Sequence, residues 1–207
     1  LMVLLMTPAL GFFYGGLVRR KNVVSTMMNV MAIIGIAILL WVAIGYTLVF
    51  GGNHGGIIGD LRWVFLNGIG MNDVSPYAES IPHLVFAAFQ MMFAIITPAL
   101  ITGALVGRMK FKALFFFVIL WSVVVYYPLA HMVWGEGGWL AEIGSIDFAG
   151  GNVVHISSGI SALTLAILLG KRKGYEKVSY RVHNIPFVVL GAGLLLVGWI
   201  GFNGGSA

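Results

Sequence analysis

A histidine and an aspartate stand out in a segment that otherwise holds almost only apolar residues. His155 lies near the middle of Phe148–Gly170, and Asp147 immediately precedes that segment. Ionisable groups at membrane mid-depth are costly, and they usually mark a permeation pathway or a proton relay. If a helix starts at Asp147, an acid that suits a helix N-terminus, His155 lies ~12 Å into the membrane and both face one lumen within about 80°. We therefore favour a functional role for His155 over a structural one.

Aromatic residues are predicted to line the outer half of the same pathway. The rise of a helix places Phe93 ~16 Å inward from Pro82, with Phe89 one turn above it on the same face. Trp134 and Phe202 fall near the outer ends of their own segments. The face of an aromatic ring attracts cations, and Trp does so most strongly. These residues predict a site that recruits a small cation, while the phenylalanine rings block hydrated ions.

Several of these residues also have simpler interpretations. Ser206 can accept a hydrogen bond from an N–H donor near the mouth, or it can back-bond to its own helix. Trp134 alone could be a residue of the interfacial aromatic belt, and any single phenylalanine in this composition could pack or face lipid. His131 is either a second site residue or an interfacial one, and we favour the interfacial position. Cysteine is absent, which excludes thiolate sites, and we expect no metal or cofactor.

The composition indicates an integral membrane protein. Of the 207 residues, 59% are hydrophobic and only 9% are charged. In a soluble domain, about a quarter of the residues are charged. Six segments lack Asp, Glu, Lys and Arg, and each is about long enough to cross ~30 Å of hydrocarbon as a helix. The sequence therefore predicts an all-α, polytopic membrane protein with six transmembrane helices. The segments are Leu1–Val18, Val23–Asn53, Ile81–Gly107, Ala113–Gly135, Phe148–Gly170 and Val182–Ala207.

The charged residues alternate between the loops that join these segments. Eleven of the 12 basic residues follow the first, third and fifth segments, and six of the seven acids lie in the other loops. The positive-inside rule then places the N-terminus outside. Orientation explains the basic residues, so no nucleic-acid partner is needed. The eleven are Arg19, Arg20, Lys21, Arg108, Lys110, Lys112, Lys171, Arg172, Lys173, Lys177 and Arg181.

Both ends of the chain fall within apolar segments, and we interpret the chain as part of a longer polytopic protein. A weak internal echo suggests an inverted repeat. The pattern Gly-Phe-x-x-Gly occurs at 11–15 and again at 201–205. Five segments separate the two copies, so they would run in opposite directions across the membrane, as in the inverted repeats of transporters.

Longer motifs occur in a fixed order along the whole chain. The most specific is D-F-A-G-G-x-V-V-H at 147–155, which continues to Gly170-Lys171-Arg172. Others are F-Y-G-G-L-V-R at 13–19, A-F-Q at 88–90, A-H-M-V-W-G at 130–135 and G-W-x-G-F-N-x-G-S at 198–206. In order and spacing, these motifs resemble those of the ammonium transporter family, the relatives of the Rh proteins.

The resemblance implies a fold of eleven helices, built from two five-helix inverted repeats and assembled as a homotrimer with one pore per subunit. Residues 1–207 would then be an incomplete ammonium transporter domain, comprising the first repeat and the first helix of the second. His155 would match the first of two pore histidines that share a hydrogen bond. The second histidine would belong to the remaining helices, which this chain lacks.

The resemblance also implies roles for the aromatic residues. Trp134 and Ser206, with Phe93 beside them, would match the outer ammonium recruitment site. Phe93 and Phe202 would match a stacked phenylalanine gate. Asp147 would match an aspartate that supports the recruitment site and its local structure, while Phe89 and His131 are accessory candidates. Because Rh proteins typically lack the recruiting tryptophan, Trp134 favours an ammonium transporter proper.

The predicted function is transport of ammonium or ammonia through the cell membrane, by a protein that is not an enzyme. Potassium cannot shed its charge, whereas ammonium can deprotonate and cross a dry, histidine-lined lumen as ammonia. An ammonium sensor with a cytoplasmic signalling domain and an Rh-type gas channel remain alternatives. An intramembrane enzyme is a weaker one, because His155 has no clear catalytic partner among Ser157, Ser158 and Ser161. The expected partners are the substrate, the lipid bilayer and, by resemblance, a trimeric cytoplasmic signalling protein.

Overall fold

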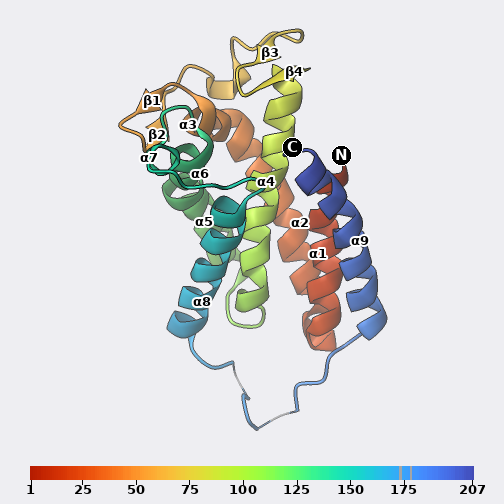
Figure 1. Ribbon diagram of the computed structural model, residues 1–207. Helices are drawn as coiled ribbons and strands as arrows, with labels where there is room; N and C mark the ends of the chain where they lie inside the picture. The colour runs from red at the N-terminus through yellow and green to blue at the C-terminus, as the bar shows by residue number, and fades with distance from the viewer. Residues whose placement is uncertain (173, 178) are drawn as a thin grey trace.

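The computed structural model describes residues 1–172, 174–177 and 179–207, and it shows a bundle of long helices under a cap of loops and short strands (Figure 1). Within the described residues, five continuous helices are long and apolar enough to cross a membrane, and the first apolar helix, Met2–Leu17, has 16 residues. The five run Arg20–Phe50, His83–Leu105, Phe111–Glu142, Gly151–Leu169 and Ile185–Gly204. The predicted all-α, polytopic fold class is confirmed.

The individual elements follow the predicted segments closely. The α-helices are α1 Met2–Leu17, α2 Val23–Leu40, α3 Tyr46–Phe50, α4 His83–Leu105, α5 Phe111–Trp121, α6 Tyr127–Trp134, α7 Trp139–Glu142, α8 Ser157–Leu169 and α9 Ile185–Gly204. Short 3-10 turns occupy Arg20–Asn22 and Val64–Leu66. Pro98 lies inside α4, which continues past it to Leu105.

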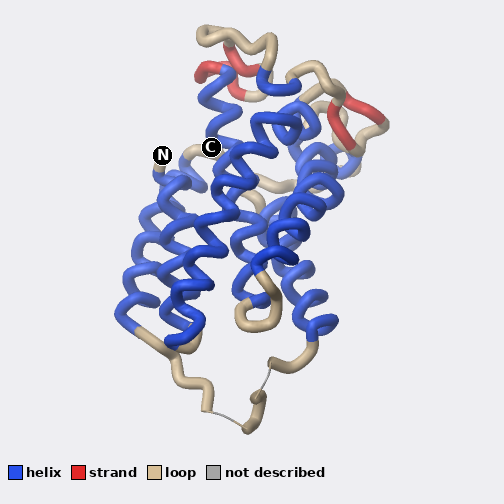
Figure 2. The backbone as a smooth tube through the Cα atoms, turned by 180° about the vertical axis from the view of Figure 1, so that it is seen from behind, coloured by secondary structure: helices blue, strands red, loops and turns tan. Residues whose placement is uncertain are grey.

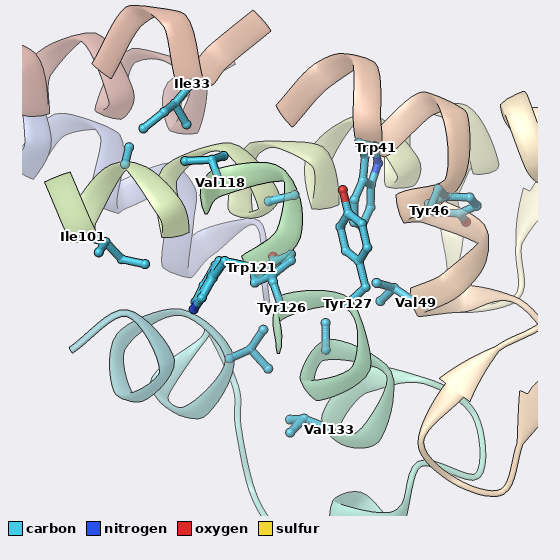
Figure 3. Packing of buried hydrophobic residues seen from close by; sticks show 14 of the residues in the cluster. Ile33, Trp41, Tyr46, Val49, Ile101, Val118, Trp121, Tyr126, Tyr127 and Val133 are labelled. Carbon is cyan, nitrogen blue, oxygen red and sulfur yellow. The ribbon is translucent and has the colours of Figure 1, made fainter. Parts of the chain in front are cut away.

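Three of the long helices contain a π-helical turn, at Trp41–Gly45, Ser122–Tyr126 and Gly151–Ile156. Each turn inserts a residue relative to a regular α-helix, so it rotates the helical face that follows, and such turns occur frequently at functional sites. The first two turns supply part of the aromatic core (Figure 3), where the rings of Trp41 and Tyr127 lie 6.0 Å apart. The Trp41 indole N–H also donates to the Ala87 carbonyl at 3.0 Å, which joins this core to α4.

The cap between α3 and α4 contains two short antiparallel hairpins that the sequence did not predict. Strand β1 (Asn53–His54) pairs with β2 (Ile58–Gly59), and β3 (Val74–Ser75) pairs with β4 (Ala78–Pro82). Pro82, from which the depth of Phe93 was counted, ends β4 immediately before α4. The strands are only two to five residues long, too short to appear as an alternating apolar pattern.

The three basic loops lie at the end of the bundle opposite the cap (Figures 1 and 2). They follow α1, α4 and α8 in the chain. The described cations of these three loops therefore share one end, as the alternation of charge predicted, whereas Arg62 lies in the cap and Lys173 lies outside the described residues. The orientation that places this end inside the cell remains a prediction from the positive-inside rule.

Helices α1 and α9 pack side by side and run in opposite directions, with the two chain ends at the same end of the pair (Figures 1 and 2). Small residues allow this close approach. A Cβ added to Gly191 of α9 would lie 2.5 Å from the Phe13 nitrogen and 2.7 Å from the Ala9 carbonyl oxygen of α1. The two copies of the Gly-Phe-x-x-Gly echo thus lie on neighbouring helices of opposite direction.

This contact predicts a contrast between two glycines of α9. Gly191→Ala will lower the free energy of unfolding by about 1–3 kcal/mol, because overpacking must push α1 and α9 apart. Gly193→Ala will leave stability unchanged or raise it slightly, since nothing lies within 4 Å of an added Cβ there. Thermal unfolding of both variants of the complete protein in detergent measures the difference. Equal melting temperatures would contradict the close packing of α1 on α9.

Candidate functional site

Two phenylalanine rings from different helices meet in the interior of the bundle. Phe93 of α4 and Phe202 of α9 have ring centroids 4.5 Å apart, with an angle of 45° between the ring planes. Each side chain is only 1% exposed. The structure thus brings together the two residues that the sequence predicted as a stacked pair, although they are far apart in the chain. The two rings form a buried apolar contact between α4 and α9, called the phenylalanine pair below.

Phe89 and Trp134 extend the phenylalanine pair into a larger aromatic cluster. The ring of Phe89 lies 5.0 Å from that of Phe93, and the ring of Trp134 lies 5.9 Å from it, both in edge-to-face geometry. Trp134 is the last residue of α6. Its indole N–H donates to the Asp147 carbonyl oxygen at 3.1 Å, so that donor is used and the faces of the ring remain for other contacts.

The Asp147 carboxylate caps the next helix with four hydrogen bonds. Its Oδ1 accepts from the backbone N–H groups of Gly150 and Gly151 at 2.6 and 2.8 Å. Its Oδ2 accepts from those of Asn152 and Val153 at 2.8 and 2.9 Å. These are the N–H groups that the start of a helix leaves without partners. The predicted capping role of Asp147 is confirmed.

The helix itself starts later than the sequence suggested. Gly150 adopts a left-handed conformation, with φ of 93°, and the π-helical turn begins at Gly151. A Cβ on Gly150 would lie 2.6 Å from Cγ2 of Val154, so the turn needs glycine. The predicted ~12 Å of helix between Asp147 and His155 is therefore wrong. Only the stretch from Gly151 to His155 is helical, about 6 Å of rise, and the shared helical face of the two residues does not exist.

His155 lies next to the phenylalanine pair, at the open side of this chain. Its imidazole is parallel to the indole of Trp199, with centroids 5.7 Å apart and 7° between the planes, and it lies 6.0 Å from the Phe202 ring. His155 is exposed in this chain. Trp199 belongs to the motif at 198–206, but it was not among the predicted site residues. Its spacing of three residues from Phe202 puts both on one helical face, and this spacing could have predicted that Trp199 lies in the site.

Ser206 follows the end of α9 and is linked to the same cluster. Its hydroxyl donates to the Phe202 carbonyl oxygen at 2.8 Å, so the back-bonding interpretation is correct. The hydroxyl oxygen still has lone pairs that can accept an N–H donor. The preceding Gly205 lies against the Phe89 ring, where an added Cβ would be 2.7 Å from Cε2. Back-bonding and a place beside the aromatic cluster are thus compatible.

His131 is buried inside this chain, where its side chain is 0% exposed. It therefore packs against other helices and does not face the surroundings of the chain. Its Nδ1 lies 2.7 Å from the Val49 carbonyl oxygen, and its Nε2 lies 3.2 Å from Oδ1 of Asn53. These partners belong to α3 and β1, on the side of α6 that supports the cap. His131 therefore joins α6 to α3 and the cap.

The serines near His155 serve the helix. Ser157 donates to the Val153 carbonyl at 2.5 Å, and Ser158 donates to the Val154 carbonyl at 2.6 Å. Ser161 accepts from the Trp121 indole at 2.9 Å, which ties α8 to α5. Hydroxyls that donate to backbone carbonyls within their own helix are not paired with a base. The intramembrane enzyme therefore has no support in this geometry.

Comparison with known proteins assigns the chain to a family. The sequence profile of the Ammonium Transporter Family matches residues 1–207. The chain belongs to this family. The ammonium transporter of Bacillus subtilis (strain 168) is 51% identical over 207 residues, which are 100% of this chain and 50% of that protein. The relatives that it matches are named as ammonium transporters, and its long apolar helices are those of a multi-pass membrane protein.

Solved structures of the family agree with the fold. The crystal structure of Candida albicans Mep2 matches with a TM-score of 0.88 and 36% identity over 99% of this chain and 46% of that chain. A structure described as a sensor Amt protein matches with a TM-score of 0.87 and 33% identity over 99% of this chain and 52% of that chain. The chain spans about half the length of the relatives that it matches.

Proposed function

We propose that the complete protein containing this chain transports ammonium across the cell membrane. The observation that carries this proposal is a continuous row of rings from Trp134 through Phe93 and Phe202 to His155, with neighbouring centroids 4.5 to 6.0 Å apart. The row connects an aromatic surface that attracts a cation with a closed apolar barrier and then with a proton acceptor. Membership of the Ammonium Transporter Family supports the same function.

Each part of the row has a separate task in this proposal. The faces of Trp134 and Phe93 attract the cation, and the Ser206 oxygen accepts one of its N–H groups, which potassium lacks. The pair of Phe93 and Phe202 excludes hydrated ions, since both rings are almost completely buried. The imidazole of His155 accepts a proton or a hydrogen bond beyond the barrier. Asp147 holds the loop and the helix start that position Trp134 and His155.

The open side of the chain indicates where the rest of the protein lies. His155 is exposed beside α8 and α9, whose large apolar residues are exposed as well, including Ile160, Leu163, Val189 and Leu196. In the proposed transporter, a second repeat covers part of this surface and supplies a second pore histidine. Residues 1–207 then form the first five-helix repeat and the first helix of the second. Lipid and the subunits of a homotrimer cover the remainder.

Orientation and partners belong to the same proposal. The N-terminus lies outside the cell membrane and the basic loops lie inside, in agreement with the alternation of charge. A trimeric cytoplasmic signalling protein would bind at the basic end. An ammonium sensor would use the same half-site, and the likeness to a sensor protein of similar fold agrees with both functions. The Rh-type gas channel is less well supported, because Trp134 is present.

A comparison of two tryptophans tests the recruitment site. Trp134→Leu in the complete protein will raise the KM for methylammonium uptake by about tenfold, because a desolvated cation–π contact contributes about 2 kcal/mol or less. Trp139→Leu is the matched control, since Trp139 is 53% exposed in α7 and away from the cluster. Uptake in cells without their own transporters gives both values. An unchanged KM for Trp134→Leu favours the gas channel, and binding without uptake by the wild type favours the sensor.

A further inference from the structure

A cavity of about 830 Å³ lies at the basic end of the bundle, remote from the aromatic site. The loop between α1 and α2, the loop that follows α4, the C-terminal end of α8 and the loop that follows α8 form its walls. Among the described residues that line it are five cations, Arg19, Lys21, Arg108, Lys171 and Arg172, and one acid, Glu176. The positive-inside rule explains why cations lie at this end. It does not explain why several of them line one cavity.

The charges within the cavity do not balance one another. The Lys171 ammonium lies 3.4 Å from the Glu176 carboxylate, so the acid among the described lining residues already has a cationic partner. The guanidinium carbons of Arg19 and Arg172 lie 5.0 and 5.1 Å from the centroid of the same ring, that of Tyr180. A ring face attracts each cation, yet two like charges around one ring still repel each other. An anion in the cavity would relieve this repulsion.

The guanidinium of Arg108 is held in place by the end of a helix. Its Nη1 donates to the carbonyl oxygens of Ala166 and Gly170, both at 3.1 Å, which caps the C-terminal end of α8. Capping by a cation suits the negative end of a helix dipole. The group is therefore fixed at the cavity wall, and its remaining donors have fixed directions.

At two arginines that line the cavity, one guanidinium donor is buried without an acceptor. The Nε–H groups of Arg108 and Arg172 have no hydrogen-bond partner in the part of the chain that the structure describes. A buried donor without an acceptor costs about 1–3 kcal/mol, so such groups require an explanation. A phosphate group offers several acceptor oxygens and matches the planar fork of arginine.

We propose that this cavity binds a phosphate group, carried either by an anionic lipid headgroup at the inner membrane surface or by free phosphate. Arg172 and Lys21 bind its oxygens, and the Nε–H of Arg108 is the fixed donor. Both line the cavity, where Lys21 is exposed and Arg172 is partly buried. Binding here is independent of transport, so the proposal stands or fails separately from the proposed function.

The test uses the complete protein in phosphatidylcholine nanodiscs and two probes. One arm titrates inorganic phosphate and follows binding by isothermal titration calorimetry. The other arm adds phosphatidylglycerol and follows bound lipid by native mass spectrometry. We expect at least one probe to bind, and the arm that saturates identifies the source of the phosphate group. Binding of neither probe would overturn the proposal.

Matched variants locate the binding to the cavity. Arg172→Gln will weaken the bound probe about tenfold or more, as expected for the loss of a charge-assisted hydrogen bond. Lys112→Gln removes the same charge from an exposed position at the same end of the bundle, outside the cavity, and will leave affinity within about twofold. If Arg172→Gln does not fold, Lys21→Gln replaces it, with a smaller expected loss. If the cavity variant and Lys112→Gln weaken binding of the probe equally, the probe is attracted by general surface charge and not bound in the cavity, which would overturn the proposal.

Discussion

Replacing His155 with alanine in the complete protein will lower the ratio of methylammonium to potassium uptake by about 100-fold or more. In the proposed pathway the imidazole is the proton acceptor that follows the pair of Phe93 and Phe202, whose rings it adjoins, and loss of a positioned acid–base group typically costs 100-fold or more in rate. Without it, the lumen has no group that favours an ion able to lose a proton over one that cannot. The ratio falls whether uptake of methylammonium is lost or potassium begins to pass.

The control is another exposed histidine, His54→Ala, which lies in strand β1 of the cap and contacts the Gly52 carbonyl at 3.3 Å. This variant will keep the wild-type ratio. Because His155 is exposed in this chain and packs mainly against Trp199 and Phe202, its replacement leaves the barrier in place. An unchanged ratio in His155→Ala, at normal expression, would remove His155 from the proposed pathway.

Replacing Asp147 with asparagine will lower the free energy of unfolding by about 2–4 kcal/mol. Each carboxylate oxygen accepts two backbone N–H groups, and asparagine retains only one of the two oxygens. Its amide NH₂ would then face two N–H donors, which lose their acceptor at about 1–3 kcal/mol each. Detergent-induced unfolding of the complete protein measures the change.

Asp73→Asn provides the comparison for this variant. The Asp73 carboxylate accepts a backbone hydrogen bond from Gly70 at 2.6 Å, in an exposed part of the cap. Asparagine can keep that bond, so the loss will be about 0.5 kcal/mol or less. If both variants lose the same stability, the four-bond cap at Asp147 does not anchor the helix that carries His155. A loss at Asp147 alone supports its role in holding the site.

The stability and activity predictions concern connected parts of one structure. The Asp147 carboxylate fixes the start of the helix that contains His155, and its carbonyl oxygen holds the indole of Trp134. A groove or pore selects among ions only when the groups that line it are held in place. In this proposal Asp147 acts through other residues, because both of its carboxylate oxygens already accept backbone hydrogen bonds.

The sequence by itself determined the class of the protein and named most residues of the candidate site. The long apolar segments and the alternation of basic loops depend only on local composition, and a helix that must satisfy its backbone in lipid follows directly from them. Asp147 as a cap is also a local feature, since a carboxylate just before a helix reaches the nearest N–H groups. Depth along a regular helix likewise follows from a constant rise per residue.

Only the tertiary structure decided which side chains meet. The π-helical turn at Gly151–Ile156 and the late helix start give His155 a different rise and direction from Asp147 than a regular helix would give. Neither feature leaves a periodic signal in the sequence. Packing sets the rotation of each helix about its axis. The packing of α9 on α1 places Trp199 beside His155, and the packing of α6 on α3 and the cap turns His131 toward Val49 and Asn53. Rise along a helix is a property of the backbone, but rotation about its axis depends on what the other helices present to it.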